Sequence, residues 1–332
     1  MNTALVRKRS INPAWGYVLF AIVALLAPLL FDDYWRSVAV VAGIYVILGL
    51  SLNVIVGYAG LFQLGHAAFY GIGAYTAAIL NIHYKIPILA LLPVSAVVAG
   101  LIAFFLVRPI LHLRGDYLAI VTIGFGEIVR IALKNDVLGI TGGPNGLSGI
   151  DRPMLFGYRF KSPLDYYYLV WILVLLSIFA FRRLENSRLG RAWNYVREDE
   201  LAAEAMGIDT VKVKLAAFVI GSAWAGLAGV LYASRYRVIS PENFTFLESV
   251  IMFSIVVLGG TGSIPGIFVG TMGMVVLPEI FRPLRDWRDA WLGVAMVVMM
   301  IIRPAGLWPS RRARLETVAT EGPPAVGPLI VP

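Results

Sequence analysis

Apolar runs of about twenty residues recur along this chain, and they restrict its fold more than any other feature. A helix that crosses a bilayer needs about 20 mostly apolar residues, because each residue rises about 1.5 Å and the hydrocarbon core is about 30 Å thick. Hydrophobic residues make up 59% of the chain and charged residues only 14%, a balance typical of an integral membrane protein. The runs that are long enough lie at approximately 14–31, 37–56, 60–80, 86–107, 117–133, 164–181 and 215–233.

A later apolar stretch, 246–281, is too long for one ordinary helix. It is interrupted between Gly259 and Gly266, where glycines admit turns and Pro265 has no amide hydrogen to donate. Two short helices with a break are therefore expected there, and a last segment is expected near 290–302. The sequence predicts an all-α, polytopic membrane protein with about ten transmembrane or re-entrant helices. It leaves open whether 246–281 crosses twice or re-enters.

Arginine and lysine gather between the apolar runs, and their positions predict the topology. Short cytoplasmic loops retain such cations. An even number of crossings then places both termini and the 182–214 loop on the cytoplasmic side, and the 134–163 loop outside. The domains expected are a cytoplasmic segment at 1–13, a transmembrane domain at 14–309 and a disordered cytoplasmic tail at 310–332. The cation clusters are Arg7, Lys8 and Arg9; Arg182, Arg183, Arg188, Arg191, Arg197, Lys212 and Lys214; and Arg303, Arg311, Arg312 and Arg314.

The composition also excludes several kinds of chemistry. The chain has no cysteine, which removes disulfides and thiol catalysis. His66, His83 and His112 form no metal-ligand spacing, and no glycine-rich phosphate loop of the GxxxxGK type is present. We therefore expect no catalytic, metal or cofactor site in this chain. The net charge of +8 lies between apolar runs, so it indicates topology rather than nucleic-acid binding.

The 182–214 loop contains a stretch, 189–209, that is expected to form one short helix. Its alanines and glutamates propagate helices, and Gly207 suits a C-terminal cap. Two interpretations stay open: the helix docks into a groove on a cytoplasmic partner, or it rests on lipid headgroups. The helical spacing places Ala202, Ala203 and Met206 on a small apolar face and leaves Glu200 and Glu204 exposed.

Polar residues at membrane depth are candidates for the transport path or for helix packing. Gln63 and His66 are three residues apart, so they are expected to share a helix face. They either join the packed bundle by hydrogen bonds or lie beside a substrate path. Glu127 is expected to pair with Arg130, because a lone carboxylate is costly at membrane depth.

The 134–163 loop holds a glycine-rich run that specifies a compact turn. It is either a structural turn or an amide-rich nest that contacts a carboxylate. The candidate residues are Thr141, Gly142, Gly143 and Asn145.

Four motifs together resemble the integral membrane permeases of bacterial branched-chain amino acid ABC importers, specifically the longer of the two paired subunits. The similarity runs from about residue 37 to 309. The motifs are Arg114–Thr122 with the following Gly124–Glu127, Thr141–Gly146, Arg197–Glu200 continuing to Gly207, and Arg303–Trp308.

The resemblance implies that 189–209 is the coupling helix that engages an ATPase. The general importer pattern is Glu-Ala-Ala, three residues and then Gly. This segment departs from that pattern, because Leu201 stands where the glutamate is usual and the downstream Leu-Pro pair is absent. The coupling residues implied are Arg197, Glu198, Asp199, Glu200, Ala202, Ala203, Glu204 and Gly207.

The resemblance further implies a second permease subunit, two cytoplasmic ATPase subunits that use ATP, and a periplasmic substrate-binding protein. The chain would lie in the bacterial inner membrane, surrounded by lipid, and import leucine, isoleucine and valine without covalent chemistry. The nearest alternative keeps this machinery and imports urea, short amides or other amino acids. Stand-alone secondary transporters or channels form a different class, and a membrane enzyme is a third alternative.

Overall fold

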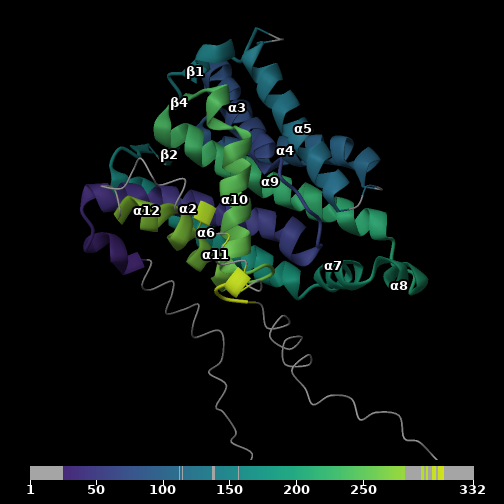
Figure 1. The fold of residues 1–332 in the computed structure, drawn as a ribbon. Helices are drawn as coiled ribbons and strands as arrows, with labels where there is room; N and C mark the ends of the chain where they lie inside the picture. The colour runs from purple at the N-terminus through teal and green to yellow at the C-terminus, as the bar shows by residue number, and fades with distance from the viewer. Residues whose placement is uncertain are drawn as a thin grey trace, which may run out of the picture.

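The computed structural model describes residues 25–111, 113, 115–136, 139–155, 157–280, 293–294, 297, 301–303 and 306–309, and these residues are mostly helical (Figure 1). The predicted terminal segments 1–13 and 310–332 lie outside the described residues, as do most of the predicted helices 14–31 and 290–302. The expected all-α membrane fold is confirmed for the part of the chain that the structure covers.

Six long helices fall on predicted apolar runs. Among the described residues, five stretches are long and apolar enough to cross a membrane: Asp33–Tyr58, Ile88–Ile110, Pro163–Glu185, Thr210–Tyr236 and Pro241–Gly259. The long helices are α2 (Asp33–Asn53), α3 (His66–Tyr84), α4 (Ile88–Val107), α5 (Asp116–Lys134), α6 (Pro163–Glu185) and α9 (Thr210–Tyr236).

Shorter elements connect these helices. Two antiparallel strand pairs are formed, β1 with β4 and β2 with β3. The remaining helices are α7 (Arg188–Glu198), α8 (Glu200–Ala205), α10 (Phe246–Gly259), α11 (Ile264–Thr271) and α12 (Leu277–Ile280). The strands are β1 (Leu147–Ser148), β2 (Met154–Leu155), β3 (Tyr158–Arg159) and β4 (Val238–Ile239). The 3-10 and π-helical turns are η1 (Ala27–Leu29), η2 (Val54–Tyr58), η3 (Arg108–Ile110), η4 (Gly143–Asn145), η5 (Pro241–Asn243) and η6 (Met272–Val276).

The helix expected at 60–80 begins later than predicted. After the π-helical turn η2, the chain leaves helical geometry at Gly60, whose φ of +69° favours glycine. Residues 61–65 carry no regular structure, and α3 starts at His66. The apolar run is continuous across this boundary because both its irregular part and its helical part are mostly buried.

Helix α9 is the centre of the bundle and packs against α2, α3 and α4. Its glycines face different neighbours: a Cβ at Gly221 would lie 2.8 Å from the Ser51 carbonyl oxygen on α2, and one at Gly229 would lie 2.3 Å from the Tyr70 carbonyl oxygen on α3. Gly226 meets α4 and also Gly73 of α3, where an added Cβ would lie 2.1 Å from the Gly226 carbonyl oxygen. Small residues thus let the backbones touch, as is typical of helix packing in membranes.

The stretch 246–281 forms the predicted two helices with a break. Helices α10 and α11 pack closely, because Gly259 and Gly266 approach each other with no room for side chains. Beyond α11 the chain reaches the start of α2, where the Tyr34 hydroxyl donates to Glu279. Helix α10 and the stretch from α11 to α12 therefore run in opposite directions along the bundle.

The two ends of the bundle carry different elements. Helices α7 and α8 lie at one end, and β1 and β4 lie at the other (Figure 1). At the β4 end, the Arg235 guanidinium donates to the Ser37 hydroxyl (3.1 Å), which joins the end of α9 to the start of α2. At the α7 end, Arg197 donates to the Gly57 carbonyl oxygen just after α2. Successive long helices alternate between these ends.

The glycine contact between α3 and α9 can be tested by adding one methyl group. Gly73→Ala should lower the free energy of unfolding by about 1–3 kcal/mol, because the new Cβ meets backbone atoms that have no room to move. The measurement is the thermal unfolding midpoint of the solubilised protein. Gly124→Ala is the matched control, since no atom lies within 4 Å of its Cβ position. An unchanged midpoint for Gly73→Ala would contradict the packing.

Candidate functional site

The 182–214 loop folds into two helices, α7 and α8, and not into the single helix that was predicted. Asp199 separates them in an extended conformation (φ −153°, ψ 108°), and its side chain accepts from the Ala202 amide at 3.0 Å as the N-cap of α8. Helix α8 ends as predicted, because Gly207 follows its last turn with a φ of +83°. Asp209 then caps α9 by accepting from the Lys212 amide (3.0 Å).

The predicted apolar face of α8 is also corrected. Ala203 is buried, whereas Ala202 is exposed and Met206 is 74% exposed. Leu201, which was not assigned to that face, is 66% exposed. Helix α8 therefore presents an apolar surface outward instead of packing it against its own chain.

The two glutamates of α8 are engaged with α9. Glu200 forms an ion pair with Lys214, and both side chains are largely buried. The Thr210 hydroxyl donates to Glu204 at 2.8 Å. These contacts fix α8 to the start of α9, which explains why Glu200 is not exposed as expected.

Helix α7 packs against the end of α2. Trp193 is completely buried, and its ring lies 6.5 Å from that of Tyr58 at an interplanar angle of 9°. The Trp193 indole donates to the Val213 carbonyl oxygen at 2.7 Å, which also joins α7 to α9. One turn later, Arg197 donates to the Gly57 carbonyl oxygen.

Residues 57–65, which we call the linking segment, begin at the end of η2, where Arg197 of α7 contacts them, and continue to the start of α3. Gln63 lies in this segment and not in a helix, so it does not share a helix face with His66 as predicted. Both side chains are nevertheless completely buried. His66 Nε2 lies 2.7 Å from the Ser51 hydroxyl, whereas neither end of the Gln63 amide has a hydrogen-bond partner among the described residues.

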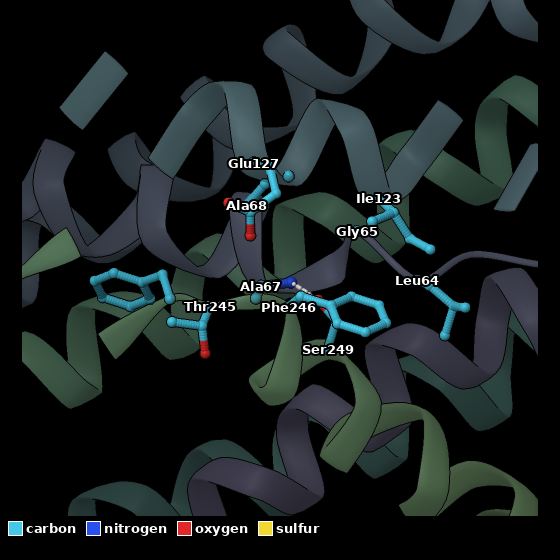
Figure 2. A pocket seen from close by; sticks show the side chains of 11 residues that line it. Leu64, Gly65, Ala67, Ala68, Ile123, Glu127, Thr245, Phe246 and Ser249 are labelled. Atoms are coloured by element: carbon cyan, nitrogen blue, oxygen red, sulfur yellow. Dashed lines mark hydrogen bonds between the residues drawn. The ribbon is translucent and has the colours of Figure 1, made fainter. Parts of the chain in front are cut away.

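A small pocket lies where the linking segment meets α3, α5 and α10 (Figure 2). Its cavity volume is about 10 Å³, roughly the room that one water molecule needs, so it is constricted in this conformation. The Ala67 amide donates to the Ser249 hydroxyl at 2.9 Å, a bond drawn across the pocket in Figure 2. The lining residues are Leu64, Gly65, Ala67, Ala68, Ile123, Gly126, Glu127, Phe244, Thr245, Phe246 and Ser249.

Glu127 is the charged residue of this lining, and its predicted partner is confirmed. Its carboxylate accepts from Arg130 at 2.9 Å. Arg130 also pairs with Glu242 at 3.1 Å, and Lys134 pairs with Glu242 at 3.0 Å. The alternating charges join α5 to η5, so Glu127 is held by a four-residue network beside the pocket.

The glycine-rich turn lies beyond the end of α5 and is not part of the pocket lining. The Thr141 hydroxyl donates to the Leu133 carbonyl oxygen and to Asp136, both at 2.8 Å, and the Thr141 amide donates to Asp136 at 2.7 Å. These bonds hold the pKa of the Asp136 carboxyl below its usual value. Gly142 and Gly143 have positive φ, and Asn145 is exposed in η4.

The candidate residues thus separate into three places: α7 with α8, the pocket, and the turn after α5. Among the described residues, no group of histidines and carboxylates is placed to bind a metal ion. Tyr58, Trp193, Thr122 and Ser249 were not predicted from the sequence as site residues. A tryptophan inside a charged loop is an available signal for burial, whereas the serine and threonine have no distinctive spacing.

Comparison with known proteins identifies related sequences. The family model described as "Branched-chain amino acid transport system / permease component" matches residues 35–303. The protein named high-affinity branched-chain amino acid transport system permease protein LivM, from Escherichia coli, is 44% identical over 322 residues, which cover 90% of this chain and 76% of that protein. No solved structure matches the chain.

More distant relatives are also informative. A probable branched-chain amino acid transport permease protein LivM of Methanocaldococcus jannaschii is 27% identical, covering 81% of this chain and 91% of that protein. The permease protein LivH of Salmonella typhimurium is 33% identical over 141 residues, 42% of this chain and 46% of its own length.

The stability of the turn after α5 is predicted to depend on pH through Asp136. The lowered pKa means that the Thr141 contacts stabilise the turn above the ordinary carboxyl pKa of about 4, and that this stabilisation is lost as the pH falls through the lowered value. Thr141→Val should therefore speed amide exchange in residues 139–149 by up to about tenfold at pH 7 and much less at pH 2–3. Hydrogen exchange measures this, with Thr76→Val on α3 as control. Equal acceleration at both pH values would contradict it.

Proposed function

Because the chain belongs to the branched-chain amino acid transport system permease component family, we propose that it is the permease subunit of an ATP-driven importer for leucine, isoleucine and valine. The observation that carries the proposal is the 44% identity to a LivM permease over 90% of the chain. The subunit performs no covalent chemistry, and ATP is bound and hydrolysed by partner subunits.

The α7 end of the bundle is assigned to the cytoplasm. Seven lysines and arginines between 182 and 214 belong to this end, and cations of short loops are retained inside. Because the long helices alternate, we infer that the β4 end lies outside, and the predicted even number of crossings supports both termini in the cytoplasm. The chain is accordingly a multi-pass protein of the bacterial inner membrane.

Helix α8 is the proposed contact with the cytoplasmic ATPases. It projects from the bundle beside α7 (Figure 1) and exposes Leu201 and Met206, two large apolar side chains. Its ion pair with Lys214 and its bond to Thr210 attach this surface to α9, so a push on α8 acts on α9 and on the adjoining α7. The periplasmic substrate-binding protein docks at the opposite end.

Helix α5 is the proposed contact with the second permease. Four charged residues lie on α5, and α5 is not among the described helices that are long and apolar enough to cross a membrane. The exposed residues on its outer face form a stripe in which neighbours are alternately four and three positions apart. This is the spacing of a helix-helix seam, and a glycine lies at its centre. The stripe consists of Tyr117, Val121, Gly124, Ile128 and Ile131.

The second permease is a suitable occupant of that face because a LivH permease is itself related to this chain. Related subunits pack through equivalent surfaces about a pseudo-twofold axis. The pocket lies on the inner side of α5, with Glu127 in its lining, which supports a transport path beside the seam.

Uptake by the reconstituted complex of the two permeases and the two ATPase subunits, with the binding protein added, tests the function. Leucine, isoleucine and valine should accumulate only with ATP and the binding protein. A Leu201→Glu, Met206→Glu double variant should lose copurifying ATPase subunits and reduce uptake at least about tenfold, because charge is placed on the apolar docking surface. Val238→Glu, exposed at the opposite end, is the control for copurification of the ATPase subunits. Leucine uptake without ATP, or ATP-driven uptake of urea or short amides but not leucine, contradicts the proposal.

The α5 seam is tested by Gly124→Leu. No atom lies within 4 Å of the new Cβ, so this chain should insert and fold normally, while the added side chain separates the subunits and reduces copurified second permease at least about fivefold. Val97→Phe at an exposed position of α4 should have no effect on assembly. Full assembly of the Gly124→Leu complex would show that the stripe faces lipid.

A further inference from the structure

Helix α7 contacts the linking segment, residues 57–65, at the first residues of the segment. The Arg197 guanidinium donates to the Gly57 carbonyl oxygen, and Gly60 lies against the same side chain, so that a Cβ there would be 2.7 Å from Arg197 Cγ. Gly60 also needs its positive φ of +69°. The contact thus depends on one arginine and on Gly60, which leaves room for it.

Helix α7 has a fixed point one turn before this contact. Trp193 is completely buried and donates to the Val213 carbonyl oxygen on α9, whereas Arg197 lies four residues further along the same face. A tilt of α7 about Trp193 therefore displaces Arg197. The displacement acts on Gly57 and Gly60.

The other end of the linking segment forms part of the pocket. The Leu64 amide donates to the Thr122 hydroxyl at 3.2 Å, and a Cβ at Gly65 would lie 2.0 Å from the Thr122 carbonyl oxygen. Leu64 and Gly65 both line the pocket, followed by Ala67 with its bond to Ser249. Movement of the segment changes the wall formed against α5 and α10.

Between these attachments lies Gln63, whose side chain is completely buried. Neither its amide nitrogen nor its amide oxygen has a hydrogen-bond partner among the described residues. A buried polar group without a partner is destabilising. A second position of the segment in which the amide is bonded would remove this cost.

We propose that the linking segment transmits the tilt of α7 to the pocket, and that Arg197 is the positioning residue that holds the segment to α7. The proposal rests on the function proposed above. The seven residues 59–65 that follow η2 reach about 25 Å at most, so attachments at both ends leave limited slack. When the ATPases close, Arg197 draws Gly57 and Gly60 with α7, and the wall at Leu64 and Gly65 moves away from Thr122.

The alternative is that Arg197 only stabilises the fold, and the two roles differ in a measurable quantity. A structural contact changes the amount of assembled complex but leaves the ATP hydrolysed per leucine unchanged. A transmitting contact leaves assembly unchanged and raises that ratio. The ratio is therefore the decisive readout.

The experiment compares R197Q, R197K and Gly60→Ala with R191Q in the reconstituted complex. Arg191 lies on the same helix, but its guanidinium donates to the Asn186 carbonyl oxygen and does not contact the linking segment. R197Q and Gly60→Ala should assemble fully and hydrolyse ATP at the basal rate, with leucine transport per ATP reduced at least about tenfold. R197K keeps a hydrogen-bond donor, so it should transport more leucine per ATP than R197Q. R191Q should transport as much leucine per ATP as the unmodified complex.

Two results would overturn the proposal: an unchanged ratio of ATP to leucine in R197Q and Gly60→Ala, or loss of assembly in both variants, which assigns the contact a structural role. Failure of the proposed function gives a different result, because the unmodified complex would then show no ATP-dependent leucine uptake.

Discussion

The close approach of α9 to its neighbours is the constraint on which the bundle depends. Lipid supplies no hydrophobic force that drives helices together, so their association relies on packing and hydrogen bonds. Gly221, Gly226 and Gly229 bring the α9 backbone against α2, α4 and α3 respectively. Helices α2, α3 and α4 are therefore held by one central helix, and the functional elements are attached around this scaffold.

Helical structure is interrupted at several places near α7, and each interruption has specific partners for its backbone. The Gly262 amide, in the turn between α10 and α11, donates to the Asn53 side chain on α2 at 2.8 Å. The carbonyl oxygens of Leu258 and Gly259 accept from Leu307 and Trp308, both at 2.9 Å. Irregular backbone at membrane depth is stable only when protein groups satisfy its hydrogen bonds, and this requirement joins α2, α10 and residues 307–308.

Hydropathy and short-range spacing predicted most of the helices and some of the contacts. The ends of α4, α5 and α6 fall within a few residues of the expected limits, since long apolar runs are reliable indicators of such helices. The Glu127 pair with Arg130 was predictable because residues three apart are neighbours on a helix. Gly207 was predictable because a left-handed residue commonly ends a helix.

Other features depend on information that hydropathy does not contain. The start of α3 was misplaced because residues 61–65 are as apolar as a helix, and hydropathy reports burial rather than backbone angles. The division between α7 and α8 was missed although Asp199 before Glu200 and Leu201 is a recognisable N-cap pattern. The contact of Tyr58 with Trp193 joins parts of the chain far apart in sequence, so no local pattern indicates it.

The central claim is that α7 and the linking segment move together relative to the bundle, and spin-label distances test it most directly. The chain contains no cysteine, so single labels can be placed in a complex whose partner subunits also lack reactive cysteine. Label pairs at Phe62 with Tyr195 and at Phe62 with Ile172 use exposed positions on the segment, on α7 at the Arg197 side of Trp193, and on α6. On ATP binding, the account predicts an unchanged distance from 62 to 195 and a changed distance from 62 to 172. A changed distance from 62 to 195 with a constant distance from 62 to 172 would contradict it.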